Sequence, residues 1–197
     1  MKNTTLLLSL IVIVTLFNSC KKNDVQPQLN LIQNGDMEAS PWNDWGFGFG
    51  SNLNSNPNNY TTEYTTEAAS SPTHSIKLKC DAVKNDTTFS YLYQRLLGGT
   101  ISTGAKLTLK IKIKTVNVQG NGISVAMRGD NIAAGKSTFF TTTQGTTVIS
   151  GSSDAFTEYT VRLDSFPANT DYLYIFLVFL PKTTGTAYMD DASLIVN

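Results

Sequence analysis

Six aromatic side chains lie in a stretch of the chain whose other residues are mostly Gly, Asn, Ser and Thr. They are Trp42, Trp45, Phe47, Phe49, Tyr60 and Tyr64. The flat apolar faces of sugar rings stack on Trp and Tyr, and short polar side chains bond the sugar hydroxyls. This mixture of residue types therefore predicts a carbohydrate-binding surface. Its candidate residues are Trp42, Asn43, Trp45, Tyr60 and Tyr64.

A second interpretation assigns part of the same cluster to the core. In "WGFGFG" the rings of Trp45, Phe47 and Phe49 alternate with Gly, as the inward-facing residues of a β-strand do. Trp42 differs from them because it follows Pro41 in a loop, where a ring is more readily exposed. Both interpretations stay open at this point.

Basic residues recur at every second position of "KLTLKIKIK", as Lys110, Lys112 and Lys114, and Arg128 has an equivalent place in the next run. Like charges at this spacing repel each other and are tolerated only on a hydrated face. Such a face keeps a sheet soluble and blocks edge pairing. If it lined a groove instead, it would select an acidic or sulfated polysaccharide.

Residues for catalysis are scarce. The chain has one histidine, His74 in "SPTHS", and no metalloprotease motif, nucleophile elbow or phosphate-binding loop. Pairs of acids that a glycosidase would need exist, such as Glu63 with Glu67, but their spacing favours none of them. With 15 basic and 15 acidic side chains the chain has no net charge to attract nucleic acid. We therefore expect a protein that is not an enzyme and does not bind nucleic acid.

Apolar residues recur with a period of two along most of the chain. The runs "SIKLKC", "YLYQRL", "KLTLKIKIK", "ISVAMR" and "YTVRL" all show it. The run "YLYIFLVFL", residues 172–180, is apolar at every position, which predicts a central strand covered on both sides. Clusters of Gly, Asn, Ser and Thr separate the runs. The pattern predicts an all-β protein, a β-sandwich or jelly roll.

The start of the chain differs from the rest. Residues 1–19 have a short positive start, an apolar middle and a small residue before Cys20, a layout typical of a secretory signal. Cys20 resembles the lipid-modified cysteine in the lipobox of bacterial lipoproteins. The resemblance implies a signal peptide over 1–19, lipid on Cys20, a polar tether over 20–28 and one domain over 29–197. It also implies a place at the cell envelope, by analogy the outer membrane of a Gram-negative bacterium, with the lipid anchor as the sole membrane contact.

Five motifs follow one another through residues 29–197. They are "NLIQNGDMEASPWNDW", "SPTHSIKLK", "YLYQRLLGGTISTGAKLTLKIKIK", "AFTEYTVRLDSF" and "TAYMDDASLIV". Their order and content resemble the galactose-binding-like jelly roll and, within it, carbohydrate-binding modules of families four and nine. Met37 stands where that family usually has Phe. The resemblance implies a β-sandwich jelly roll over the whole of this range, a fold that carries sugar binders, adhesins and structural modules alike.

The same resemblance implies a metal site. In this family a structural calcium ion commonly joins the opening and closing strands, and the matching positions are Glu38 and Asp190. Calcium takes about six to eight oxygen ligands, which carboxylates and backbone carbonyls supply. Asp190 lies in a run otherwise suited to burial, so its charge needs a cation or several hydrogen-bond donors. In the alternative, Glu38 is a solvated loop acid and a neighbouring loop donates hydrogen bonds to Asp190.

These features together predict a surface lipoprotein that binds a poly- or oligosaccharide without cleaving it, with calcium in a structural role. A structural or adhesive envelope lipoprotein that binds a protein partner is the alternative. A small jelly-roll glycosidase or lyase is a third, weaker candidate, because the residues favour no catalytic pair.

Overall fold

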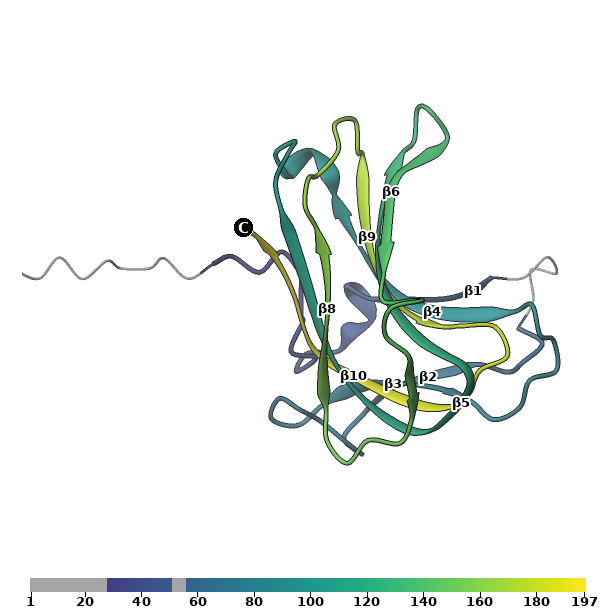
Figure 1. Ribbon diagram of the computed structural model, residues 1–197. Helices are drawn as coiled ribbons and strands as arrows, with labels where there is room; N and C mark the ends of the chain where they lie inside the picture. Colours follow the sequence, from purple (N-terminus) through teal and green to yellow (C-terminus); the bar gives the residue numbers. More distant parts are fainter. Residues whose placement is uncertain (1–27, 51–55) are drawn as a thin grey trace, which may run out of the picture.

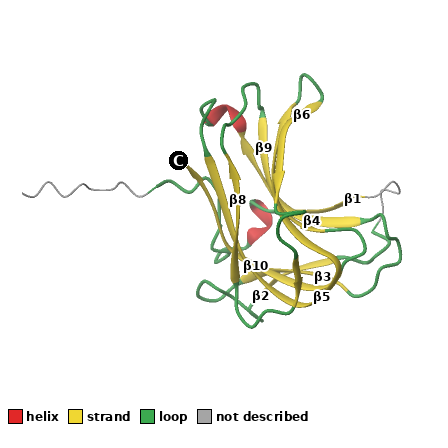
Figure 2. Cartoon of the chain, in the orientation of Figure 1, coloured by secondary structure: helices red, strands yellow, loops and turns green. Residues whose placement is uncertain are grey.

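Strands make up nearly all the regular structure of the protein. The computed structural model describes residues 28–50 and 56–197 (Figure 1). The strands are β1 (Gly46–Gly50), β2 (Thr61–Thr65), β3 (Ser75–Cys80), β4 (Phe89–Leu97), β5 (Leu107–Asn131), β6 (Lys136–Thr142), β7 (Ile149–Gly151), β8 (Thr157–Leu163), β9 (Tyr172–Phe179) and β10 (Thr184–Val196). Two short 3-10 turns, η2 (Pro41–Asn43) and η3 (Gly98–Thr100), are the helical elements in Figure 2.

The predicted signal peptide, Cys20 and all of the tether except Gln28 lie outside the described residues. Within the described part of the chain, no helix is long and apolar enough to cross a membrane. The predicted anchor therefore stays a prediction from the sequence.

Two antiparallel sheets share the long strand β5. Sheet A has the order β1-β4-β9-β5, with β6 on the far side of β5, and sheet B has the order β2-β3-β10-β5, with β8 beyond it. Figure 1 shows β5 sweeping from one sheet into the other. Gly120 and Gly122 lie between its two halves with φ of 82° and 80°, a conformation that side chains with a Cβ rarely adopt.

The core lies between the inner faces of the two sheets. The alternation of "KLTLKIKIK" puts Leu109 and Ile111 of β5 fully inside, against residues of sheet A such as Leu177 and Leu92 in the same hydrophobic cluster. Burying a side chain of this kind stabilises the fold by about 1.5–3 kcal/mol. Cys80, also in this cluster, is a buried free thiol on β3, where it alternates with Ile76 and Leu78 on the inner face. The predicted all-β sandwich is confirmed.

The first described residues lie along the last strand. The backbone N–H of Leu31 donates to the carbonyl of Leu194 at 2.9 Å, and that of Ala192 donates to the carbonyl of Gly35 at 2.7 Å. The Asn30 side chain accepts from the N–H of Leu194 at 2.8 Å. The opening segment thus depends on β10 for its backbone hydrogen bonds.

Candidate functional site

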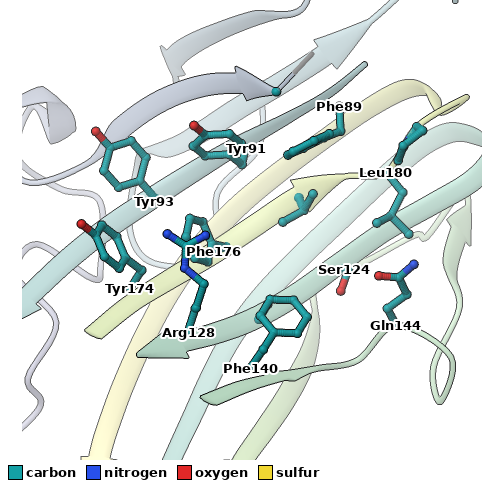
Figure 3. A pocket seen from close by; sticks show the side chains of 14 residues that line it. Phe89, Tyr91, Tyr93, Ser124, Arg128, Phe140, Gln144, Tyr174, Phe176 and Leu180 are labelled. Atoms are coloured by element: carbon teal, nitrogen blue, oxygen red, sulfur yellow. The ribbon is translucent and has the colours of Figure 1, made fainter. Parts of the chain in front are cut away.

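The outer face of sheet A carries a row of aromatic rings that no other element of the described chain covers. On β4 the side chains alternate, so that Leu92 is fully buried in the core while Tyr91 and Tyr93 on either side of it point outward and are half-buried. On β9, Tyr174 and Phe176 occupy the corresponding outward positions. Figure 3 shows these rings, with that of Phe89, lying side by side on the floor of one groove.

The register of the strands makes the rings contiguous. Tyr93 pairs with Phe176 across β4 and β9, and the Tyr91 ring meets the Phe176 ring edge-on at 5.7 Å between centroids. Along β4 the Tyr91 and Tyr93 centroids are 5.8 Å apart, and along β9 the Tyr174 and Phe176 rings are nearly parallel at 5.9 Å. The result is a broad aromatic floor made of rings from two neighbouring strands.

Strand β1 leaves space for these rings because its sequence is GFGFG. Its three glycines stand opposite the three rings of β4. A Cβ at Gly48 would lie 2.7 Å from Cζ of Tyr91, and at the other two glycines it would likewise meet the ring opposite. The alternate residue Phe47 packs against the core. The glycines of "WGFGFG" therefore make room for the floor of the groove, while its aromatic residues face the other way.

The far wall of the groove comes from β5, β6 and the loops beside them. Ser124, Ala126 and Arg128 of β5 line it, and Phe140 of β6, with 59% of its surface exposed, stands at its edge. Gln144 reaches toward the same space in Figure 3. The groove has a volume of about 630 Å³, within the range of sites for small ligands.

Arg128 is the one charged residue among the described residues that line the groove. Its guanidinium lies over the rings of Tyr174 and Phe176, at 5.3 and 5.6 Å from their centroids, a favourable cation–π arrangement. Its Nη2 donates to Oδ2 of Asp130 at 2.8 Å, and Asp130 also accepts from the Ser137 hydroxyl at 3.0 Å. The arginine is thus fixed both by the rings beneath it and by an ion pair at one end.

Two of the predicted sugar-stacking residues belong to the core, which corrects the prediction. Trp45 is 2% exposed, and its indole N–H lies 3.4 Å from the carbonyl of Asn34. Tyr60 is 3% exposed, and its hydroxyl donates to the carbonyl of Thr88 at 3.0 Å. Neither ring has a free face on which a sugar could stack. The core interpretation of Trp45 was the right one.

The other three predicted residues are accessible but do not line the groove. Trp42, 44% exposed, and Asn43 lie on η2. Tyr64 lies on β2 of the opposite sheet, where its ring stacks on that of His74 at 4.5 Å and its hydroxyl donates to the carbonyl of Glu38 at 3.0 Å. The structure does not assemble these residues into one site with the aromatic floor.

Glu38 and Asp190 are both held by the loop of residues 70–74. The Asp190 carboxylate is fully buried and accepts from the N–H groups of Ser70 and Ser71 at 2.6 and 2.9 Å. Its other oxygen accepts from the Ser71 hydroxyl at 2.8 Å and from the N–H of Asp191 at 2.7 Å. Burial raises the pKa of Asp190, and these donors oppose that shift.

Glu38 is bonded in the same way. It accepts from the N–H groups of Thr73 and His74 at 3.0 and 3.1 Å and from the Thr73 hydroxyl at 2.6 Å. All four carboxylate oxygens of Glu38 and Asp190 therefore accept hydrogen bonds from neighbouring donors, which can offset their charge without a cation. Among the described residues, no three acids, histidines or cysteines gather as metal ligands would. Calcium stays a prediction of the resemblance alone.

The lysine ladder and Arg128 lie on one strand but on different sheets, so they do not form a joint basic face. Lys110 pairs with Glu158 at 2.8 Å, and Lys112 pairs with Asp191 at 2.9 Å, both on the outer face of sheet B. Two of the three lysines are thus charge-paired on this face, which agrees with the prediction of a hydrated face and not with a basic groove.

The residues of the groove were missed because β9 was interpreted as covered on both sides, which is wrong. Its inner face, with Leu173, Ile175, Leu177 and Phe179, is buried, but its outer face, with Tyr172, Tyr174 and Phe176, is open. The available signal was the restriction of rings to alternate positions in "YLYQRL" and in the first half of "YLYIFLVFL". Aromatic rings that recur on the same face of two neighbouring strands indicate a surface with a function other than core packing.

Comparison with known proteins supports the assignment of the fold. No family model and no curated protein sequence matches this chain. Among solved structures, the carbohydrate-binding module TmCBM61 in complex with β-1,4-galactotriose matches with a TM-score of 0.54 at 10% identity, over 86% of this chain and 99% of that one. A family 4 carbohydrate-binding module matches with a TM-score of 0.55 at 14% identity, over 84% and 99% of the two chains.

Two further solved structures match this chain. The CBM22-1 xylan-binding domain of Paenibacillus barcinonensis Xyn10C matches with a TM-score of 0.55 at 9% identity, over 82% of this chain and 91% of that one. The enzymatically active domain of bacteriophage CBA120 tailspike protein 4 matches with a TM-score of 0.61 at 14% identity, over 85% of this chain but only 21% of that one. The fold is therefore the β-sandwich jelly roll found in carbohydrate-binding modules, as the sequence motifs predicted.

Proposed function

We propose that this protein binds a poly- or oligosaccharide in the groove of sheet A and does not cleave it. The observation that carries the proposal is the open aromatic floor formed by Tyr91, Tyr93, Tyr174 and Phe176 in a groove of about 630 Å³. Ring centroids 5.7–6.0 Å apart give a continuous apolar surface that suits the C–H faces of several consecutive sugar rings.

The polar groups of the groove are few and lie at its wall, where they can meet hydroxyl groups. Arg128 supplies N–H donors and Gln144 an amide, whereas the Ser124 hydroxyl is buried and shares a hydrogen bond with the Thr142 hydroxyl. Sites for small ligands commonly combine an apolar lining with a small number of such groups, which fix orientation. The modules named above give independent support, since one was solved with β-1,4-galactotriose and another is described as xylan-binding.

The composition of the groove favours binding without hydrolysis. Glycosidases use a pair of carboxyl groups on either side of the scissile bond, and no Asp or Glu is among the described residues that line this groove. The match to a tailspike domain described as enzymatically active does not alter this inference, because the present chain covers 21% of that protein.

Affinity electrophoresis tests the proposal. The protein would be run through gels that contain neutral plant and bacterial polysaccharides, and isothermal titration with oligosaccharides of the retarding polymer would follow. Replacing Tyr93 or Phe176 with Ala should lower the affinity roughly tenfold, because each change removes one stacking surface. Thermal unfolding should change little, since both rings lie on the outer face.

Trp42→Ala is the matched control, because Trp42 is an exposed ring outside the groove. It should leave the affinity unchanged. If Trp42→Ala abolished binding while Tyr93→Ala did not, the site would lie at η2 instead. If no polysaccharide retarded the protein and a protein partner were captured through the aromatic face, the adhesive alternative would replace this proposal.

We further propose that the binding domain is held at the cell envelope, in the outer membrane of a Gram-negative bacterium, by lipid on Cys20. This part rests on the signal-like residues 1–19 and the cysteine that follows them. More than one acyl chain on a single residue gives stable attachment. Metabolic labelling with palmitate tests it, and a mature protein that carries no label would overturn it.

A further inference from the structure

We propose that Asp130 sets the charge selectivity of the groove. Asp130 balances the charge of Arg128, so that the arginine donates hydrogen bonds to the hydroxyl groups of uncharged sugars. The same charge balance keeps acidic polysaccharides from binding. The inference rests on the proposed function, because it concerns which carbohydrate the same groove accepts. Arg128 is the residue that would contact the sugar, and Asp130 acts through it as a positioning residue.

The surroundings of Arg128 hold the guanidinium in one plane. The rings of Tyr174 and Phe176 lie beneath it at 5.3 and 5.6 Å, and Asp130 bonds its Nη2 at 2.8 Å. Within the described chain Asp130 is the one hydrogen-bond partner of the guanidinium. Its Nε is buried without a partner, and Nη1 keeps its donors for a ligand. The Arg128 side chain is 41% exposed, which leaves it within reach of a molecule lying on the aromatic floor.

Asp130 is less accessible than the arginine that it holds. Its side chain is 17% exposed, and it bonds both Arg128 and the Ser137 hydroxyl. It is not among the residues that line the groove. Asp130 therefore contributes its negative charge to the site without offering a carboxylate to the ligand.

The net charge of the groove follows from this pair. Arg128 is the one charged residue of the described groove lining, and the ion pair with Asp130 cancels its charge at short range. A second arginine, Arg95, lies over Tyr172 at 4.7 Å, beyond the groove lining. A guanidinium whose charge is balanced by a carboxylate still donates hydrogen bonds to hydroxyl oxygens, whereas an unpaired arginine would bind the carboxylate of a uronic acid or a sulfate group in a bidentate manner.

The test is a gain of binding in Asp130→Asn. The amide oxygen of Asn can still accept the bond from Arg128, so the guanidinium stays in place but its charge is no longer cancelled. Wild-type protein and variants would be compared in gels with a neutral polysaccharide that retards the wild type and in gels with polygalacturonate or alginate, at low and high NaCl. We expect Asp130→Asn to bind the acidic polymers about tenfold more tightly than wild type at low NaCl, with the gain lost at high NaCl.

Two controls separate this effect from a general change of charge. Asp154→Asn removes the same charge from an exposed loop between β7 and β8 and should give no gain. Adding Arg128→Ala to Asp130→Asn should abolish the gain, and Arg128→Ala alone should weaken binding of the neutral polymer roughly tenfold or more.

The outcomes distinguish this inference from the proposed function. If the wild type preferred acidic to neutral polymers, or if Asp130→Asn gained no acidic binding, the inference would be wrong and the proposed function would stand. If no polysaccharide of either kind bound any variant, the proposed function would fall and this inference with it.

Discussion

The carboxylate of Glu38 receives three hydrogen bonds from Thr73 and His74. These donors, the Thr73 hydroxyl foremost, lower the pKa of Glu38 from 4.5 to about 2. A carboxyl group whose pKa falls on folding stabilises the folded state above its unfolded pKa and loses that contribution as the pH falls toward the folded pKa. The contribution of Glu38 is therefore complete above pH 4.5 and lost near pH 2.

Thermal unfolding of the wild type and of Glu38→Gln across this range measures the effect. The wild type should be the more stable at neutral pH, and the difference in melting temperature should shrink as the pH falls from 4.5 to about 2. Asp190, whose pKa is raised mainly by burial, changes stability with the opposite sign, but it is present in both proteins. A difference that stayed constant over the whole range would show that the loop does not favour ionised Glu38.

At the scale of elements, β1 contributes to the binding face through its glycines, which leave space for the aromatic rings of β4. In Gly48→Ala the new methyl group would lie 2.7 Å from the Tyr91 ring, so the ring must move while the strand can stay. We expect a melting temperature close to that of the wild type and an affinity for the bound polysaccharide about two- to tenfold lower. Differential scanning calorimetry and isothermal titration measure the two quantities.

Gly99→Ala is the control, because a Cβ there meets no atom within 4 Å. It should change neither quantity. Loss of stability without loss of affinity in Gly48→Ala would mean that the glycines serve strand packing alone and that the Tyr91 ring takes no part in binding.

The strands were predictable because the pleat of a β-strand imposes a period of two on its residues. The groove was not predictable, because alternation shows that the two faces of a strand differ in composition but does not show which face another element covers. On β9 both sets of alternate residues are largely apolar, and the outer set is open because β9 lies between β4 and β5 and no element of residues 28–50 or 56–197 packs on its outer side. Likewise, the residues around Tyr60 bury its ring, whereas the residues around Tyr93 leave its ring half-exposed.

At the scale of the whole molecule, the loop of residues 70–74 links the opening segment to β10, because it donates hydrogen bonds to both Glu38 and Asp190. Because each carboxylate oxygen already accepts a hydrogen bond, we expect EDTA to leave the melting temperature unchanged. A fall in EDTA that added calcium restored would instead establish the calcium ion predicted from the resemblance, since a ligand of the folded state alone raises its stability. Unfolding monitored by circular dichroism provides the measurement.

The pairing of the opening segment with β10 also bears on the order in which the domain folds. The backbones of Leu31 and Gly35, near the start of the domain, bond to those of Leu194 and Ala192, near its end. Sheet B has the same dependence, since β10 must insert between β3 and β5. Contacts between such distant parts of a chain form slowly. We therefore expect the insertion of β10 to be a late step of folding, and the edges of β3 and β5 to be prone to aggregation until it occurs.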